Sequence, residues 1–150
     1  MRRNNMACII RPVVAEDFDQ VYDFINALEN HIFPKEKQLA IFLENLAHPK
    51  HIFLLAEIDH QPVGFLSCHV QNLIHHGGLV GEIQEMFVDE KYRSQQIGKQ
   101  LLDALKTLAK QNNLLQIEVT SGFKREQAHA FYEREGFPHT HKKFVWKVEE

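Results

Sequence analysis

The sequence predicts one α/β domain of the α+β kind, built on a mixed β-sheet. Its 150 residues match the size of a single compact domain. Strand and helix patterns follow one another in the order β-α-α-β-β-β-α-β-α-β, without an internal repeat, a low-complexity tract or a linker. Three consecutive strands favour an antiparallel meander, and the later strand-helix-strand order favours a parallel crossover.

The first third of the chain is predicted to form a strand and two helices. The strand spans Met6–Arg11 and ends at Pro12. The first helix spans Ala15–Asn30, because its apolar residues recur at helical spacing. They are Phe18, Val21, Tyr22, Ile25 and Leu28. The second helix spans Lys35–Ala47 and stops before Pro49. Its apolar face consists of Leu39, Phe42, Leu43 and Leu46.

Three strands in succession are predicted for the middle of the chain. His51–Ile58 and Pro62–Val70 are largely apolar and are joined by the turn Asp59–Gln61. After a loop that contains His75–Gly78, the third strand spans Leu79–Val88. We expect these strands to pair as antiparallel neighbours.

Two helices and two strands complete the predicted order. Gln96–Asn112 is an amphipathic helix with a continuous apolar face, and Leu114–Thr120 is the next strand. Arg125–Glu135 is a helix that ends at Gly136, the residue type that most easily takes the left-handed conformation after a helix. Phe144–Val148 (FVWKV) is predicted to be the last strand.

Composition and charge argue against several classes of function. The net charge is −3, so the chain lacks the excess positive charge that holds general nucleic-acid binders and anionic-membrane binders. No apolar run approaches the roughly 18 residues of a transmembrane helix, and the start lacks the apolar stretch of a signal peptide. Cys8 and Cys68 are too few for a disulfide framework. We therefore expect a cytoplasmic protein with reduced thiols and no nucleic-acid or membrane partner.

A strand, a short polar turn and a helix start follow one another between Glu82 and Leu102. The free N–H groups of a helix start form a site for anions, and Gly98 lets the backbone approach a ligand closely. Neither a GxxxxGK[ST] phosphate loop nor a GxGxxG dinucleotide fingerprint is present. By itself the segment reads either as an ordinary strand-to-helix turn or as a phosphate-binding turn.

A second segment, Ala128–Phe137 (AHAFYEREGF), makes the pattern more specific, although alone its aromatic residues read as core positions. Together the two segments read Val88-Asp89-x-x-Tyr92-Arg93-x-x-Gln96-x-Gly98-x-x-Leu101-Leu102 and then Ala128-x-x-Phe131-Tyr132-x-x-x-Gly136-Phe137. This combination, in this order, resembles the GNAT superfamily of N-acetyltransferases. The resemblance implies a mixed, mostly antiparallel sheet of six to seven strands with about four helices. It also implies that two parallel strands, about 82–88 and 114–120, splay apart to form a cleft for acetyl-CoA.

The resemblance also implies which residues bind acetyl-CoA. The family's pyrophosphate-binding loop matches Arg93, Ser94, Gln95, Gln96, Ile97, Gly98 and Lys99. The sequence departs from the family pattern at Gln96, which replaces the first glycine of that loop. The pantetheine arm is expected to pair with the backbone of Met86, Phe87 and Val88, as an added half-strand.

Catalytic roles follow from the same resemblance. Tyr132 matches the family tyrosine that protonates the departing CoA thiolate. An alkylammonium must lose a proton before it attacks a thioester, so a base is required. Glu82 is the first candidate and Glu85 the second, either by direct contact or through a water molecule. Simple alternation puts these two glutamates on opposite faces of the strand, unless a β-bulge intervenes. Arg125 replaces a common family asparagine seven residues before the tyrosine.

A closer resemblance within the superfamily suggests the acceptor. The GEIQE core (Gly81–Glu85), the adjacent pair His75-His76 and the segment Lys124–Phe137 are similar to aminoalkylphosphonate N-acetyltransferases. A phosphonate dianion favours basic side chains or a bound cation. The candidate residues for binding the amine substrate are His75, His76, Glu85, Lys124, Arg125 and His141.

That subgroup is associated with divalent-metal dependence, so a divalent metal ion is a candidate second cofactor. His75 and His76 are weak candidate ligands, because adjacent side chains often point apart. Two alternative functions stay open: acetylation of another amine (a protein N-terminus or lysine, polyamine, amino sugar or drug), or a non-catalytic acyl-CoA-binding module. A homodimer also stays open.

Overall fold

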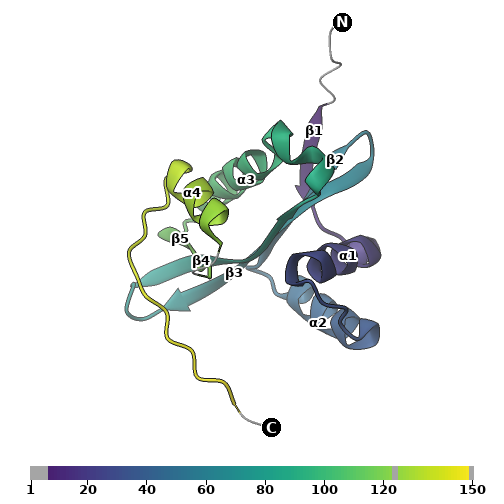
Figure 1. Ribbon diagram of the computed structural model, residues 1–150. Helices are drawn as coiled ribbons and strands as arrows, with labels where there is room; N and C mark the ends of the chain where they lie inside the picture. The colour runs from purple at the N-terminus through teal and green to yellow at the C-terminus, as the bar shows by residue number, and fades with distance from the viewer. Residues whose placement is uncertain (1–6, 123–124, 149–150) are drawn as a thin grey trace, which may run out of the picture.

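The computed structural model describes residues 7–122 and 125–148, and these form a five-stranded sheet with two helices on each side (Figure 1). The strands are β1 (Cys8–Pro12), β2 (Ile52–Ile58), β3 (Gln61–Leu73), β4 (Gly78–Val88) and β5 (Gln116–Val119). The helices are α1 (Phe18–Glu29), α2 (Lys35–Ala47), α3 (Ile97–Gln111) and α4 (Glu126–Arg134). Two 3₁₀ segments, η1 (Ala15–Asp17) and η2 (Glu90–Gln95), precede α1 and α3.

The sheet is mixed, as the sequence predicted. Its strands lie in the order β1-β2-β3-β4-β5, and the pairs from β1 to β4 are antiparallel. The chain then crosses through α3 and returns as β5, which pairs with β4 in parallel. The β1–β2 connection runs through α1 and α2, two hairpins join β2 to β3 and β3 to β4, and one crossover completes the sheet.

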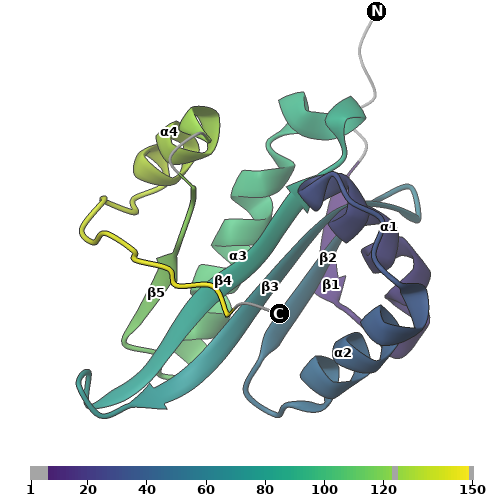
Figure 2. The same ribbon diagram turned by 60° about the horizontal axis from the view of Figure 1, so that its bottom comes forward.

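Helices cover both faces of the sheet (Figure 2), and each face has its own hydrophobic core. Helix α3 packs on one face through Leu101, Leu102 and Leu105, which are fully buried. Helices α1 and α2 cover the other face through a cluster in which aromatic residues predominate. Its buried members are Val13, Phe18, Val21, Phe24, Phe42, Leu55 and Phe65. Replacing a buried leucine of α3 by alanine would cost roughly 2–5 kcal/mol of folding free energy.

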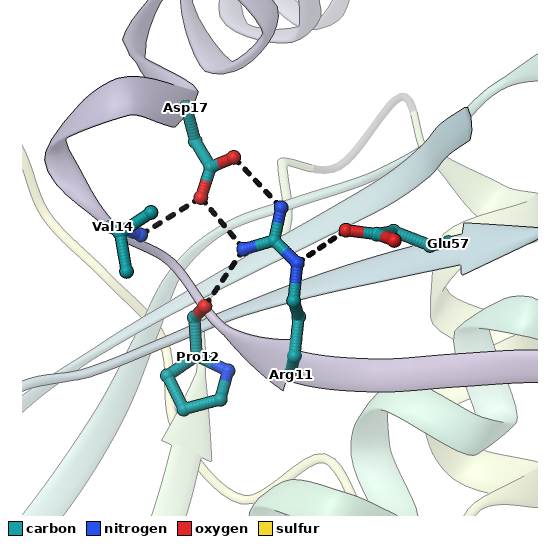
Figure 3. A network of polar contacts seen from close by, with 5 residues as sticks. All are labelled: Arg11, Pro12, Val14, Asp17 and Glu57. Carbon is teal, nitrogen blue, oxygen red and sulfur yellow. Dashed lines mark hydrogen bonds and ion pairs between the residues drawn. The ribbon is translucent and has the colours of Figure 1, made fainter. Parts of the chain in front are cut away.

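An ion-pair network fixes the start of α1 to the sheet (Figure 3). The guanidinium of Arg11, on β1, donates to both carboxylate oxygens of Asp17 at 2.8 Å and also bonds the carboxylate of Glu57 on β2. Asp17 accepts a further bond from the amide of Val14 at 2.8 Å. The guanidinium beside it lowers the pKa of Asp17 below its ordinary value. The network therefore sets where α1 lies over the sheet.

The structure corrects the predicted strand count. Residues 144–148 form no strand, so the described residues make a five-stranded sheet and not one of six to seven strands. The apolar residues of this segment are exposed: Phe144 by 90%, Val145 by 69%, Trp146 by 82% and Val148 by 79%. Strand propensity alone does not make a strand, because a strand needs an edge to pair with.

Candidate active site

The parallel pair of strands opens part of the way along β4. Pairing between β4 and β5 begins at Val80 opposite Gln116 and ends at Ile83 opposite Val119. Strand β4 continues to Val88, and within the described chain residues 84–88 have no strand partner on the β5 side. The parallel pair that the family resemblance implied is present, and the part of β4 beyond it has backbone N–H and C=O groups available to an extended ligand.

Helix α3 begins beside this opening with a left-handed residue. Gln96 has φ 57° and ψ 32°, a conformation that glycine adopts without strain. This explains why the family pattern favours glycine at that position, and Gln96 keeps the same turn. The first amide bond back to Gln96 is donated by Gln100 at 3.1 Å, so the amides of 97–99 precede the hydrogen-bonded part of the helix. The sequence analysis placed the pyrophosphate-binding loop at this helix start.

Gly98 lies where α3, α4 and β4 approach one another. A Cβ atom at this position would lie 3.2 Å from the ring of Phe131 and 3.3 Å from the terminal methyl of Met86. Both contacts are tighter than ordinary van der Waals packing, so a larger residue at this position would require these side chains to shift by a few tenths of an ångström.

The basic residues of the loop have partners within the protein. The Nε of Arg93, in η2, donates to the carbonyl of Val88 at 3.2 Å. Lys99 lies 3.2 Å from the carboxylate of Glu135 and 3.5 Å from that of Asp103. Ser94 and Gln95 lie in η2, just before the left-handed turn. The Arg93 bond therefore ties η2 to the end of β4, and the Lys99 pairs tie the start of α3 to Asp103 and to Glu135.

Tyr132 projects from α4 toward β4. Its hydroxyl donates to the sulfur of Met86 at 3.8 Å, and its ring packs against the core on the α3 face. Burial raises the pKa of Tyr132 above its ordinary value of 10, and this effect exceeds the opposing effect of Arg125. The hydroxyl therefore carries its proton at neutral pH and can donate it.

One buried polar atom near the opening has no partner among the described residues. It is the hydroxyl of Ser121, which follows β5 by two residues. A buried hydroxyl without a hydrogen bond is costly, so such an atom commonly marks a site where a ligand or water supplies the bond. The sequence analysis did not identify this residue.

The two candidate glutamates lie on the same face of β4. Between Ser67 and Cys68 of β3 the partner on β4 shifts from Glu85 to Ile83, so Gln84 is the extra residue of a β-bulge. Glu85 faces α1 and α2, and Glu82 is the register partner of His69 on that same face. The simple alternation considered in the sequence analysis is therefore interrupted.

Each glutamate has a different polar neighbour. The hydroxyl of Ser67 donates to the carboxylate of Glu85 and accepts from its backbone amide at 3.0 Å. The carboxylate of Glu82 accepts a 3.0 Å bond from the side chain of Gln84. No Lys or Arg among the described residues forms a salt bridge with either glutamate. Glu85 is thus a carboxylate held by a neutral donor.

A cavity of about 80 Å³, partly open to solvent, lies between the two N-terminal helices and the sheet. Aromatic and aliphatic side chains from α1 and α2 form one wall, and β2, β3 and β4 form the other. Its polar lining residues are Tyr22, Gln38, Asn45, Ser67, His69 and Glu85. Of these, the sequence analysis identified Glu85 as a site residue. The others lacked a motif, and their approach depends on how α1 and α2 pack on the sheet.

Three histidines form a stack that ends at this cavity. The ring centroids of His48 and His51 are 3.8 Å apart, and those of His51 and His69 are 4.1 Å apart, with nearly parallel rings. The Nδ1 of His51 accepts a bond from the amide of Val70 at 3.1 Å. Burial, and then the neighbouring imidazoles of His69 and His48, lower the pKa of His51 to about 4. The central ring is therefore neutral at pH 7.

The remaining predicted acceptor residues do not line this cavity. His75 and His76 occupy the β3–β4 turn, where His76 lies 3.8 Å from the carboxylate of Glu118. Arg125 precedes α4, and His141 lies in the exposed segment after it. Lys124 is outside the described residues.

No three or more His, Cys, Asp or Glu side chains of residues 7–122 and 125–148 cluster as a metal site would require. Over the same residues, no helix has the length and hydropathy to cross a membrane.

Comparison with known proteins agrees with this geometry. The family model described as "Acetyltransferase (GNAT) family" matches residues 18–137. An aminoalkylphosphonate N-acetyltransferase of Salmonella typhimurium is 36% identical, over 92% of this chain and 90% of its own length. Among solved structures, an aminoglycoside N-acetyltransferase in complex with CoA superposes with a TM-score of 0.86 at 16% identity, covering 99% of both chains. An aminoglycoside 6′-N-acetyltransferase of Acinetobacter baumannii gives 0.83 at 18% identity, covering 96% of this chain and 99% of its own.

The splayed strands, the helix start beside them and the match over most of the chain lead to the same conclusion: this protein belongs to the GNAT family and is an acetyl-CoA-dependent N-acetyltransferase.

Proposed function

We propose that the protein transfers the acetyl group of acetyl-CoA to the primary amine of a small aminoalkylphosphonate. The observation that carries this proposal is Glu85, a carboxylate that lines the cavity beside the open end of β4. An anionic group held by a neutral hydroxyl attracts an ammonium group. The cavity lies between helices and a sheet, which suits a small acceptor better than a lysine on a folded protein.

The acetyl-CoA side of the site would use backbone groups. The amides of 97–99 would bind the pyrophosphate at the start of α3, and residues 86–88 would pair with the pantetheine arm. The hydroxyl of Ser121 would supply a further hydrogen bond to the bound arm.

The reaction would proceed with one base and one acid. Glu85 removes a proton from the ammonium group of the acceptor, directly or through a water molecule, and frees its lone pair. The nitrogen attacks the thioester carbonyl, the C–N bond forms and the C–S bond breaks. Tyr132 donates its proton to the departing sulfur. The nitrogen loses its second proton as the amide forms, which restores the phenol of Tyr132, and Glu85 releases its proton to solvent. The products are the N-acetylated acceptor, CoA and one proton.

Glu85 rather than Glu82 is our first candidate for the base, because Glu85 lines the cavity. Glu82 lies on the same face, beside Gln84 and opposite His69. A base acting from Glu82 would need a water molecule to reach an amine in the cavity, as the sequence analysis also considered.

The phosphonate is supported by the similarity to the Salmonella aminoalkylphosphonate N-acetyltransferase. Among the described residues, the cavity lining contains His69 as its basic side chain and no Lys or Arg. Arg125 and His141 remain candidates if the bound acceptor extends beyond the cavity. A metal ion takes part in none of the steps above. The assay below measures whether a divalent cation changes the activity.

The experiment compares 2-aminoethylphosphonate with ethylamine in an assay of acetyl-CoA-dependent CoA release. Each charge-assisted bond to the phosphonate contributes roughly 1.5–3 kcal/mol, so kcat/KM should be about 10- to 100-fold higher for the phosphonate. Each amine is assayed with a divalent cation and with a chelator. Equal values for the two amines would refute the phosphonate assignment and leave the acetyltransferase activity standing. Higher activity on a lysine peptide would favour a protein acceptor, and absence of turnover on every amine would favour the binding module.

A further inference from the structure

The cavity beside the open end of β4 is lined by one carboxylate and one basic side chain of the described residues. Glu85, on β4, supplies the carboxylate, and His69, on β3, supplies the imidazole. We propose that His69 binds the acidic group of the acceptor, and that the site takes small amines with an acidic group two carbons from the nitrogen. This proposal rests on the proposed function, because it places the amine at Glu85.

The two side chains lie on the same face of the sheet, at a spacing that a small molecule can bridge. Ser67 is the register partner of Glu85, and His69 follows Ser67 by two residues on β3. Residues two apart on a strand point to the same face and lie about 6.6 Å apart. This is the length scale of a molecule with two carbons between its ammonium and its acidic group. One such molecule can therefore contact both side chains.

The ring nitrogens of His69 are available to a ligand. Within residues 7–122 and 125–148, neither nitrogen forms a hydrogen bond or a salt bridge, and neither is a buried atom without a partner. The nitrogens therefore reach solvent at the open side of the cavity. An imidazolium at this position has two N–H donors for the oxygens of a phosphonate or a carboxylate.

Two aromatic neighbours hold the imidazole of His69 in place. The ring of His51 stacks on it at 4.1 Å with an angle of 5° between the planes. The ring of Phe53 meets it at 6.1 Å and 69°, an edge contact. A side chain that is already fixed by packing loses little conformational freedom when it binds a ligand. The packing therefore prepares His69 for its contact with an anion.

The stacked neighbour does not compete for positive charge. The Nδ1 of His51 accepts the amide of Val70 at 3.1 Å, and burial lowers the pKa of His51 to about 4. His51 is therefore neutral at pH 7, so a protonated His69 meets no like charge from the ring stacked on it. The remaining wall of the cavity is largely aromatic and aliphatic, and among the described residues it contains no Lys or Arg. A preference for acidic amines in this cavity would thus depend on His69.

The experiment measures kcat/KM for 2-aminoethylphosphonate, β-alanine and ethylamine. The first two carry a phosphonate and a carboxylate two carbons from the nitrogen, and ethylamine carries neither. We expect both acidic amines to exceed ethylamine in the wild type. His69→Gln keeps a polar side chain but removes the cation, so the ratio of each acidic amine to ethylamine should fall about 10- to 100-fold.

Two further variants support the comparison. His69→Asn is a second neutral replacement and should lower the ratios in the same way. His60→Gln is the matched control, because His60 is exposed in the turn between β2 and β3 and does not line the cavity. It should leave both ratios at their wild-type values. Each ratio is taken within one variant, so a smaller fraction of active protein cancels.

The outcomes separate this proposal from the proposed function. Wild-type ratios in both His69 variants would overturn the role of His69 and leave the phosphonate assignment standing. A wild type that prefers β-alanine but not the phosphonate, with a ratio that falls in His69→Gln, would support His69 and refute the phosphonate assignment. Equal values for all three amines in the wild type would refute both.

Discussion

The hydroxyl of Tyr132 lies 3.8 Å from the sulfur of Met86, so α4 meets β4 at the point where β4 has lost its pairing with β5. The contact brings a buried, protonated phenol to the backbone that is expected to bind the pantetheine arm. A proton donor is thus present beside the part of β4 to which the proposed function assigns the thioester.

Tyr132→Phe removes this hydroxyl and retains the ring. We expect kcat to fall by about 100-fold, because protonation of the leaving sulfur loses its donor. Binding of acetyl-CoA, measured by calorimetry, should change little. If kcat is unchanged, water or another group protonates the thiolate.

Gly98→Ala tests the start of α3. The added methyl would lie 3.2 Å from Phe131 and 3.3 Å from Met86, so it should displace the loop and weaken acetyl-CoA binding about tenfold. Gly122→Ala is the control, because nothing described lies within 4 Å of its Cβ position. Calorimetric titration of both variants checks the prediction. Normal affinity in Gly98→Ala would contradict the assigned loop.

Acid should weaken the fold through Asp17. Its pKa is lower in the folded protein than its ordinary value of 3.8, so the Asp17–Arg11 pair stabilises the fold above that value. This stability is lost as the pH falls through the lower, folded-state pKa. Asp17→Asn should therefore be less stable than the wild type at neutral pH, by roughly 1–3 kcal/mol, and the two should converge in acid. Urea unfolding at several pH values checks this, and a constant difference would contradict it.

The lowered pKa of His51 should make the folding stability depend on pH in a second range, which lies above that of Asp17. Its pKa is about 4 in the folded protein and ordinarily 6.5, so the unfolded chain binds the proton more readily. The stabilisation that neutral His51 contributes should be complete above pH 6.5. It should decline as the pH falls from about 6.5 to 4, because the unfolded chain takes up the proton. His51→Gln should flatten this part of the stability profile and leave the lower window of Asp17. A wild-type profile that is flat from pH 7 to 5 would contradict the assignment.

The sequence was sufficient to predict the features that depend on local pattern. The apolar face of α3, the strand-turn-helix at Gly98 and the order of the elements up to α4 follow from spacing, and the structure confirms them. The splayed pair followed from the family resemblance.

Features that depend on distant contacts could not be predicted in the same way. The bulge at Gln84 has no mark in the sequence, yet it decides which glutamates share a face. Ser67 and His69 reach the cavity because β3 pairs with β4 beneath α1 and α2. The strand predicted at Phe144–Val148 was wrong, because strand propensity in a segment says nothing of whether a partner edge is available.

The most direct test of the account compares Glu85→Gln with Glu82→Gln in kcat/KM for 2-aminoethylphosphonate. Glutamine keeps the shape of Glu85 and can still accept from Ser67, so the change removes the base and little else. We predict a loss of about 100-fold or more for Glu85→Gln and a change of only a few-fold for Glu82→Gln. Wild-type activity in Glu85→Gln with a large loss in Glu82→Gln would contradict the account and assign the base to Glu82.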